Sequence, residues 1–344
     1  MRHDDGDQAQ GSANGQPAGQ SAPQVPVRAL VLATTGLIVV IVAFFASYTS
    51  ALGKPSARHI PLAVTASPAA VRTLDASPLL GVRPVAGLTR GRSLVEDRTV
   101  DGALALPVAG PATLLVAGGA GHAVQAVLVQ VGERAAAARA SRLNVIDVAP
   151  TSPGDPNGLV EFYCVVFLGI GGAAGAMALY RISGPVRGLS GALQRLGLVV
   201  LYSGALSVIV TVFADVVFGA LIGHFGLLFL ALWAFVTAVC LAVTGFAARF
   251  GLAAAAVLIL AFIALGNPSS AGAVPRPLLN GLYSWLNPVL PQGAALSALR
   301  GVQYFGSHGN GVALLCLLLW AAAGLVLLLA AGMRGPRRGA VTAS

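Results

Sequence analysis

Apolar and polar positions divide this chain into six long apolar runs and one long mixed segment. The first run covers residues 29–48, and five more follow at about 159–180, 197–221, 226–246, 251–266 and 312–331. A helix of about 20 residues, rising about 1.5 Å per residue, crosses a hydrocarbon core of about 30 Å. The pattern therefore predicts six membrane-spanning helices, the fifth of which is near the lower length limit.

The first run has a second interpretation, a secretory signal peptide, because the small residues Ser47, Ser50 and Ala51 lie at its end. Signal peptides usually have an apolar region of about 7–15 residues, which is shorter than this run. A retained transmembrane helix at 25–52 is therefore favoured. The preceding residues 1–24 are rich in Gly, Gln, Ala and Pro, and they predict a disordered cytoplasmic tail.

Residues 53–158 alternate short β-type runs with helical ones, and they predict a compact α/β domain of typical size. One expected helix follows Ser67, whose side chain can cap it. Asp101 and Gly102 form the expected turn before a strand that pairs with the next one as a hairpin. The expected strands cover 59–66, 81–86, 103–108, 112–117 and 144–148, and the expected helices cover 68–74, 93–100 and 121–142.

Composition separates this chain from soluble proteins. It is 56% hydrophobic and 10% charged, whereas soluble domains usually carry about 25% charged residues. We therefore expect an α-helical polytopic membrane protein, with five helices at 159–331 following the α/β domain. The formal charge of +9 raises the possibility of nucleic-acid binding, but the arginines are scattered and there is one lysine, so no nucleic-acid partner is expected.

The segments between apolar runs predict the topology. Arginines occur without acids in the 181–196 segment, in the 247–250 turn and in the basic tail at 332–344. These segments alternate with the 222–225 turn, whose only ionisable residue is His224, and with the 267–311 segment. The positive-inside rule then places both termini in the cytoplasm and residues 53–158 outside the plasma membrane.

No catalytic motif is found. Lys54 is followed by Pro55, so the chain has no Gly-Lys-Ser/Thr loop for phosphate, and it also lacks the H-E-x-x-H and G-x-S-x-G patterns. Cys164, Cys240 and Cys316 fall in three different apolar runs, which is neither a metal spacing nor a disulfide framework. We expect no enzymatic activity, no cofactor and no metal.

Two acids lie near the predicted membrane boundary, Glu161 and Asp215. A carboxylate inside a membrane span is a functional candidate by default. The alternative, which we favour, is that both are solvated or paired near the outer boundary. The pairs Gly171/Gly175 and Gly219/Gly223 have the Gly-x-x-x-Gly spacing that lets helices approach closely, so packing is their expected role.

The stretch at 266–304 is too rich in Pro and Gly to span a bilayer, yet too apolar for an ordinary loop. Pro277 can start one short helix, and a second is expected at 293–304. We predict that the pair dips into or lies on the outer leaflet as re-entrant or interfacial helices, and the alternative is a loop that caps the bundle. The candidate residues of an external gate are Pro277, Tyr283, Trp285 and Arg300.

The segments together resemble a known family. DRTVDGALAL at 97–106, LLVAGGAGHAV at 114–124 and VIDVAPTSPGDPNG at 145–158 are similar to external-domain signatures of ABC-2-type export permeases, in the phage-infection-protein-like (YhgE/Pip) branch. GNPSSAG at 266–272 and LPQGAALSALRGVQYF at 290–305 resemble the non-spanning helical pair of the same branch. The order of one span, an external domain and five spans also resembles this family.

This resemblance implies a homodimeric permease subunit that exports an amphipathic or lipidic molecule with a separate ATPase subunit. It also implies an ATPase contact on the 181–196 segment, with Arg187, Leu189 and Arg195 as candidates; the alternative is a merely positive-inside loop. The polar tail reaches Arg28 without the amphipathic helix usual in export permeases. The alternative function is a membrane-anchored surface binding or scaffolding protein without transport activity.

Overall fold

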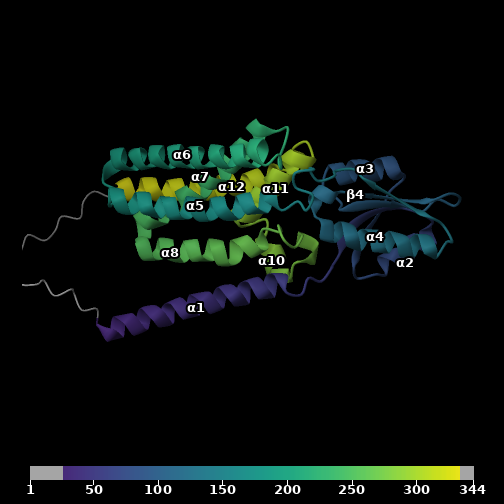
Figure 1. The fold of residues 1–344 in the computed structure, drawn as a ribbon, viewed down its shortest axis with the longest axis horizontal. Coiled ribbons are helices and arrows are strands. Elements are labelled where there is room, and N and C mark those ends of the chain that lie inside the picture. The colour runs from purple at the N-terminus through teal and green to yellow at the C-terminus, as the bar shows by residue number, and fades with distance from the viewer. Residues whose placement is uncertain (1–25, 334–344) are drawn as a thin grey trace, which may run out of the picture. The chain divides into compact units, whose positions relative to one another are not determined.

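The computed structural model describes residues 26–333 (Figure 1). Within that range the chain is mostly helical, and six helices are long and apolar enough to cross a membrane. A five-stranded sheet with its own helices follows the first of these six. The predicted tail at 1–24, and nearly all of the predicted tail at 332–344, lie outside the described residues. At this coarse level, six long apolar helices and one α/β domain, the expected fold class is confirmed.

Helix α1 (Val27–Leu52) contains the whole of the first predicted run. With 26 residues it is about 39 Å long, which exceeds a hydrocarbon core of about 30 Å. Residues 27–43 belong to one structural unit, and residues 44–52 belong to the larger unit formed with the rest of the chain. All the contacts described below lie within this larger unit.

The sheet has the strand order β2-β1-β3-β4-β5, in which β3 and β4 are antiparallel and the other neighbours are parallel. All five expected strands are present, and the expected hairpin pairs Gly102 with Val116. The strands are β1 (Ile60–Thr65), β2 (Leu80–Pro84), β3 (Gly102–Ala105), β4 (Ala112–Val116) and β5 (Leu143–Asp147).

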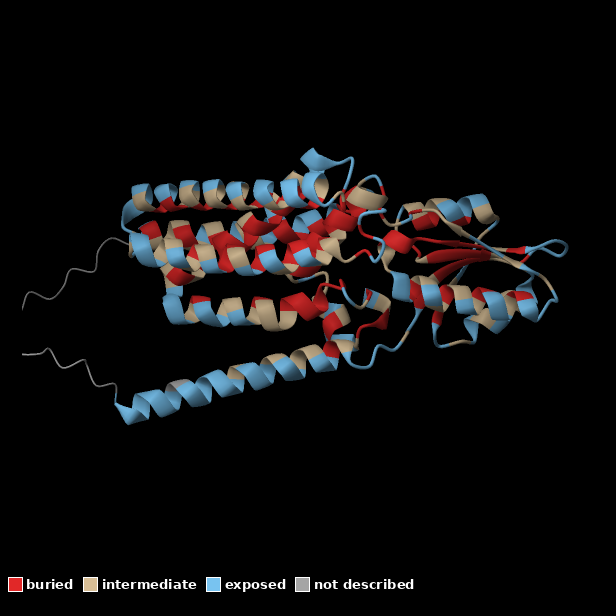
Figure 2. Cartoon of the chain, viewed as in Figure 1, coloured by how far each residue is buried: buried red, intermediate tan, exposed pale blue. Residues whose placement is uncertain are grey.

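Helices cover both faces of this sheet, so its strands are the buried layer of the domain (Figure 2). Helices α2 (Pro68–Asp75) and α4 (His122–Ala137) pack on one face, against side chains such as Leu62 and Leu114. Helix α3 (Leu88–Glu96) packs on the other face, against Ala63 and Leu115. Successive residues of a strand point to opposite faces, which is why neighbouring positions enter different apolar clusters.

Two helices of the domain end earlier than expected. Helix α3 ends at Glu96 instead of continuing to residue 100, and α4 ends at Ala137 instead of residue 142. In α3, Thr99 N donates to Leu94 O and Arg98 N donates to Val95 O, both at 2.9 Å, which is the Schellman pattern. Arg98 has φ of 58°, and Ala140 after α4 has φ of 49°. Glycine is usual at such positions, so these ends carry no glycine signal in the sequence.

The remaining long helices form a bundle around α7. Helix α7 (Phe225–Phe250) packs against the four others and is the most buried of them. A side-chain carbon at Gly245 would overlap Gly324 in α12, and one at Gly324 would overlap the backbone of Leu241. The other helices are α5 (Val160–Ser183), α6 (Gly188–Val212, extended by a π-helical turn at Phe213–Val217), α8 (Leu252–Ala261, extended by a π-helical turn at Phe262–Gly266 and by α9 at Asn267–Ser269) and α12 (Gly311–Met333).

The two Gly-x-x-x-Gly pairs have different outcomes. Gly171 and Gly175 lie in α5 against α6, where the Tyr202 hydroxyl donates to Gly171 O at 2.7 Å. The Tyr202 ring fills the space in which a side chain at Gly175 would lie, so packing is confirmed. Gly219 and Gly223 lie in the turn after α6 with positive φ values of 59° and 92°. Their helix-packing prediction is wrong, since they supply turn conformations instead.

The expected 181–196 loop is also much shorter than predicted. Helix α5 continues to Ser183 and α6 begins at Gly188, which leaves four residues between them. Arg195 is therefore inside α6, where it is buried and donates hydrogen bonds to Leu179 O and Gly184 O. Its guanidinium also lies 5.2 Å from the centre of the Tyr180 ring. The predicted loop is wrong because both helices extend into it, and Arg195 packs against the end of α5.

The 266–304 stretch forms two helices, as expected, with changed bounds. Arg276–Leu278 is a 3-10 turn, and α10 (Gly281–Leu286) begins after Asn280, whose Oδ1 accepts from Tyr283 N at 3.3 Å. Pro277 therefore does not start the first helix. Helix α11 (Pro291–Tyr304) is buried along nearly its whole length by α5, α7 and α12. It does not lie on a surface, because protein encloses it.

Candidate functional site

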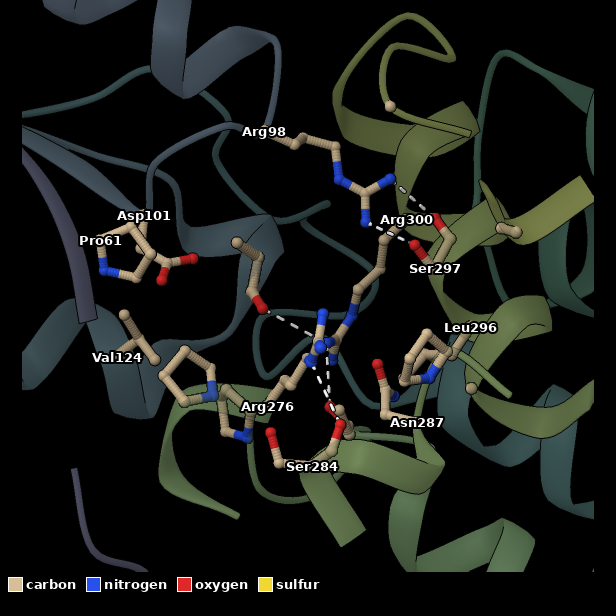
Figure 3. Close-up of a pocket in the computed structure, with 18 of the residues that line it drawn as sticks. Pro61, Arg98, Asp101, Val124, Arg276, Ser284, Asn287, Leu296, Ser297 and Arg300 are labelled. Carbon is tan, nitrogen blue, oxygen red and sulfur yellow. Dashed lines mark hydrogen bonds between the residues drawn. The ribbon is translucent and has the colours of Figure 1, made fainter. Parts of the chain in front are cut away.

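A cavity of about 650 Å³ lies between the α/β domain and the segment from residue 270 to residue 313. We call it the junction cavity. Its volume is within the range of about 300–1,000 Å³ that is typical of small-molecule sites. Among the residues that line it are four arginines and one acid, and Figure 3 labels three of the arginines and the acid. These lining residues are Arg58, Arg98, Arg276, Arg300 and Asp101.

Arg98 joins the α/β domain to α11. Its Nη1 donates to Ser297 O at 2.9 Å and to Asn310 Oδ1 at 3.1 Å, and its Nη2 donates to Ser297 Oγ at 3.0 Å (Figure 3). The guanidinium carbon also lies 5.3 Å from the centre of the Phe305 ring. Burial, together with the nearby charge of Arg300, lowers the pKa of Arg98 to about 10, so it stays protonated at neutral pH. Its three hydrogen bonds fix the side chain of Arg98, which stands on a left-handed backbone.

Arg300 is the most deeply buried cation of the junction cavity, with 7% of its surface exposed. Its two terminal nitrogens donate to four backbone carbonyls at 3.1–3.4 Å. Its Nε has no acceptor in the described range. Because the four carbonyls come from the α/β domain, the start of α5 and the loop after α9, Arg300 links three parts of the chain. The carbonyls belong to Ala120, Gly158, Ala271 and Gly272.

Arg58 and Arg276 are held differently. Ser56 N donates to Leu278 O at 3.2 Å and Arg58 N donates to Pro277 O at 3.1 Å, so the backbones of 56–58 and 276–278 lie side by side. Both arginine side chains are exposed. Arg276 Nε donates to Ser284 O at 3.3 Å, and its terminal nitrogens have no acceptor among residues 26–333. Across residues 26–333 the ion pair is Arg92 with Glu96, so neither arginine has a carboxylate partner there.

Asp101 is the acid of the junction cavity. Burial raises the pKa of its carboxyl group to about 6, and the charges of Arg98 and Arg276 oppose that rise. The side chain forms no ion pair within 4 Å among the described residues. At neutral pH the four arginines therefore outnumber one mostly ionised carboxylate, and the cavity is positively charged.

Apolar side chains complete the walls of the junction cavity. They come from α3, α4, α11 and α12 and from the residues that follow α3 and α11. A cavity with both positive and apolar walls suits an amphipathic anion better than a small inorganic ion. The larger apolar residues in the lining are Val95, Val100, Val124, Leu296, Phe305 and Val312.

A second polar cluster lies at the start of α5. Glu161 is fully buried, and neither of its carboxylate oxygens has a hydrogen-bond partner in the described residues. The Tyr304 hydroxyl also lacks one, and its pKa is raised by burial first and by the charge of Glu161 second. Asp155 caps the helix, because its carboxylate accepts from Leu159 N at 3.1 Å and from Val160 N at 2.7 Å. The solvated alternative for Glu161 is therefore wrong, because the side chain is fully buried. The paired alternative stays a prediction, with Arg300 and Tyr304 as the groups that act on its carboxylate.

The candidate ATPase-contact residues separate into two groups. Arg187 precedes the first residue of α6, and Leu189 lies in its first turn; both side chains are exposed. Arg195 is buried two turns later and is occupied by carbonyls of α5 and the turn after it. Only the first two are placed so that another protein can reach them.

The four candidate gate residues lie in different surroundings. Pro277 and Arg300 line the junction cavity. Tyr283 is buried, and its hydroxyl donates to Ser47 O at 2.9 Å, so its side chain is enclosed by protein. Trp285 is 64% exposed. Asp215 is half-buried in the π-helical turn after α6, away from the residues that line the junction cavity.

Sequence reasoning did not assign a site role to Arg58, Arg98, Asp101 or Arg276. Arg98 and Asp101 lie in the 97–106 segment that carries the family resemblance, and Arg276 is one of two charges in the 266–304 stretch. An isolated arginine in an apolar stretch was the available signal. Their convergence depends on backbone pairing between segments more than 200 residues apart, which no local pattern reveals.

A metal site and a similarity to known proteins are two further sources of functional information. Among residues 26–333, no three His, Cys, Asp or Glu side chains are grouped closely enough to hold a metal ion. Comparison with protein-family models, with curated proteins and with solved structures gave no match for this chain.

Proposed function

We propose that this protein is the permease subunit of an ABC-2-type export system, which moves an amphipathic or lipidic molecule across the plasma membrane with a separate ATPase subunit. Both termini are cytoplasmic in this proposal, residues 53–158 are extracytoplasmic, and the subunit acts as a homodimer. The six long apolar helices support a multi-pass membrane protein. The observation that carries the transport role is the junction cavity.

The walls of the junction cavity support transport because they belong to both parts of the protein. Helix α11 lines the cavity through Leu296, Ser297 and Arg300, and the same helix packs inside the bundle against α5, α7 and α12. A molecule in the cavity would therefore contact an element whose position is tied to the membrane helices. A surface binding protein needs its helices only as an anchor, and an anchor does not require such a shared helix.

Co-purification tests this proposal. The full chain is purified in mild detergent from its native cells, and the preparation is assayed for a bound ATPase subunit and for ATP hydrolysis. We expect a stoichiometric ATPase subunit whose rate changes on assembly. The variants Arg187→Glu and Leu189→Asp are expected to lower the recovered ATPase about tenfold, since both side chains are exposed at the short α5–α6 turn.

The matched control is Arg249→Glu. The sequence predicts Arg249 in a turn at 247–250, but it lies in the last turn of α7, at the end of the helix that the predicted topology places on the same side of the membrane. This variant is expected to leave recovery of the ATPase unchanged. Absence of any co-purifying ATPase from wild-type preparations that remain folded would overturn the permease proposal and favour the surface binding protein.

A further inference from the structure

We infer that the junction cavity binds the anionic group, a phosphate or a carboxylate, of an amphipathic molecule, and that Arg58 and Arg276 contact this group. The inference rests on the proposed function, because it names the chemical class of the exported molecule. It is carried by the geometry of the two arginines and by the apolar walls beside them.

The four arginines of the junction cavity differ in how many of their N–H donors are free. Arg98 and Arg300 already donate to seven acceptors between them, so most of their N–H groups are occupied. Arg58 has no side-chain hydrogen bond in the described residues, and Arg276 has one, from Nε. Two guanidinium groups with free terminal nitrogens therefore line the same cavity.

Arg58 and Arg276 lie on two backbone segments that are hydrogen-bonded to each other. Hydrogen bonds from Ser56 and Arg58 to Leu278 and Pro277 hold the two arginine-bearing segments together. Two exposed cations on one cavity wall attract an anion more strongly than one cation does. The planar N–H fork of an arginine matches the oxygens of a phosphate or a carboxylate, which makes such a group the expected counterion.

The apolar walls of the junction cavity indicate what the bound molecule contains besides its anionic group. Positive charge alone would attract any anion, but the cavity continues between Val124, Leu296 and Val312. Burying an apolar chain there strengthens binding with each methylene group that leaves water. A free phosphate gains nothing from these walls, whereas an acyl or alkyl chain does, so the exported molecule is expected to combine both.

Binding to the purified full chain tests the inference. Dihexanoyl phosphatidic acid and decanoate are the anionic probes, dihexanoyl phosphatidylcholine is the neutral one, and inorganic phosphate represents the free anion. Dissociation constants are measured by titration calorimetry. We expect both anionic probes to bind at least about tenfold more tightly than the phosphatidylcholine, and inorganic phosphate to bind more weakly than the phosphatidic acid.

Arg58→Gln and Arg276→Gln are each expected to weaken both anionic probes about tenfold or more while leaving the phosphatidylcholine unaffected. Arg83→Gln is the control, because Arg83 is an exposed arginine of the same domain that does not line the cavity. Thermal unfolding of each variant shows whether it is folded.

Three results would overturn the inference: equal affinity for anionic and neutral probes, an Arg83→Gln effect as large as that of Arg58→Gln, or unchanged affinity for the anionic probes in a folded variant that carries both Arg58→Gln and Arg276→Gln. If inorganic phosphate binds as tightly as the phosphatidic acid, the lipid part of the inference is wrong and the site takes a free anion. The same preparations are assayed for the ATPase subunit. A bound ATPase without anion binding rejects the substrate class alone, and anion binding without an ATPase rejects the permease proposal alone.

Discussion

The two sides of the junction cavity hold their arginines in opposite ways. On the α11 side, Arg98 and Arg300 are tied by hydrogen bonds to carbonyls and polar side chains of other segments. On the side formed by 56–58 and 276–278, Arg58 and Arg276 are exposed and have free terminal nitrogens. The difference shows that a charged cavity need not be uniform, because one pair of cations fastens the protein together and the other remains available to a ligand.

The largest expected effect comes from the buried member of the fastening pair. Arg300→Met removes the donor from four carbonyls, three of them buried, and this is expected to lower stability by about 3 kcal/mol or more. Arg300→Lys should lose less, since an ammonium keeps three donors. Thermal unfolding of the full chain in detergent measures both. Arg83→Met is the control, and equal midpoints for Arg300→Met and Arg83→Met would contradict the fastening role.

The next effect depends on pH. Because burial raises the pKa of Asp101 to about 6, its ionised form destabilises the folded protein at neutral pH. This penalty is lost as pH falls through about 6, since the folded protein then binds the proton more readily than the unfolded chain does. Asp101→Asn is therefore expected to stabilise the protein by about 1–3 kcal/mol at pH 7 and to have little effect near pH 4.

Asp101→Asn is also expected to tighten binding of an anion at neutral pH. The groups that face the same cavity are Arg58, His59, Arg98, Arg276 and Arg300, so His59→Gln is the control for the pH profile. An alkyl sulfonate is the suitable probe, because it keeps its charge throughout. If wild type and Asp101→Asn change in parallel with pH, a different group is responsible.

The smallest expected effect distinguishes the contribution of the Arg98 backbone conformation from that of the side-chain hydrogen bonds. Arg98→Ala removes three hydrogen bonds but keeps a non-glycine residue at φ of 58°. Arg98→Gly removes the same bonds and relieves the left-handed conformation, which costs about 1 kcal/mol for other residues. Arg98→Gly should therefore be more stable than Arg98→Ala by about 1 kcal/mol. The reverse order in thermal unfolding would show that the turn after α3 relaxes without Arg98.

The strands of the α/β domain and the long apolar helices could be predicted because their periodicity is local. Leu62 and Leu114 lie beside Ala63 and Leu115, which face α3, so both faces of these strands are apolar and the strands appear in the sequence as short apolar runs. The ends of α3 and α4 could not be predicted, because Arg98 and Ala140 occupy positions where glycine is the usual signal.

The enclosure of α11 could not be predicted either. Its sequence has a stripe that is only partly apolar, and it contains the polar residues Gln292 and Arg300, which do not indicate burial inside protein. In the structure Gln292 Nε2 donates to Phe262 O at 2.9 Å, and Arg300 is satisfied by carbonyls up to 180 positions away. Because backbone carbonyls have no residue-specific signature, a polar side chain that is buried against them looks like an exposed one in the sequence.

The contact between α11 and the sheet has a practical consequence for cutting the chain. Phe305 and Tyr304 pack in the apolar cluster beneath α3, together with Leu94 and Leu115. A fragment that ends near residue 158 keeps the sheet but loses the aromatic residues that cover this face, and it leaves the guanidinium of Arg98 without its acceptors. The covalent boundary of the domain is thus not its physical boundary, and a soluble fragment would need residues 291–310 supplied in trans or joined by a linker.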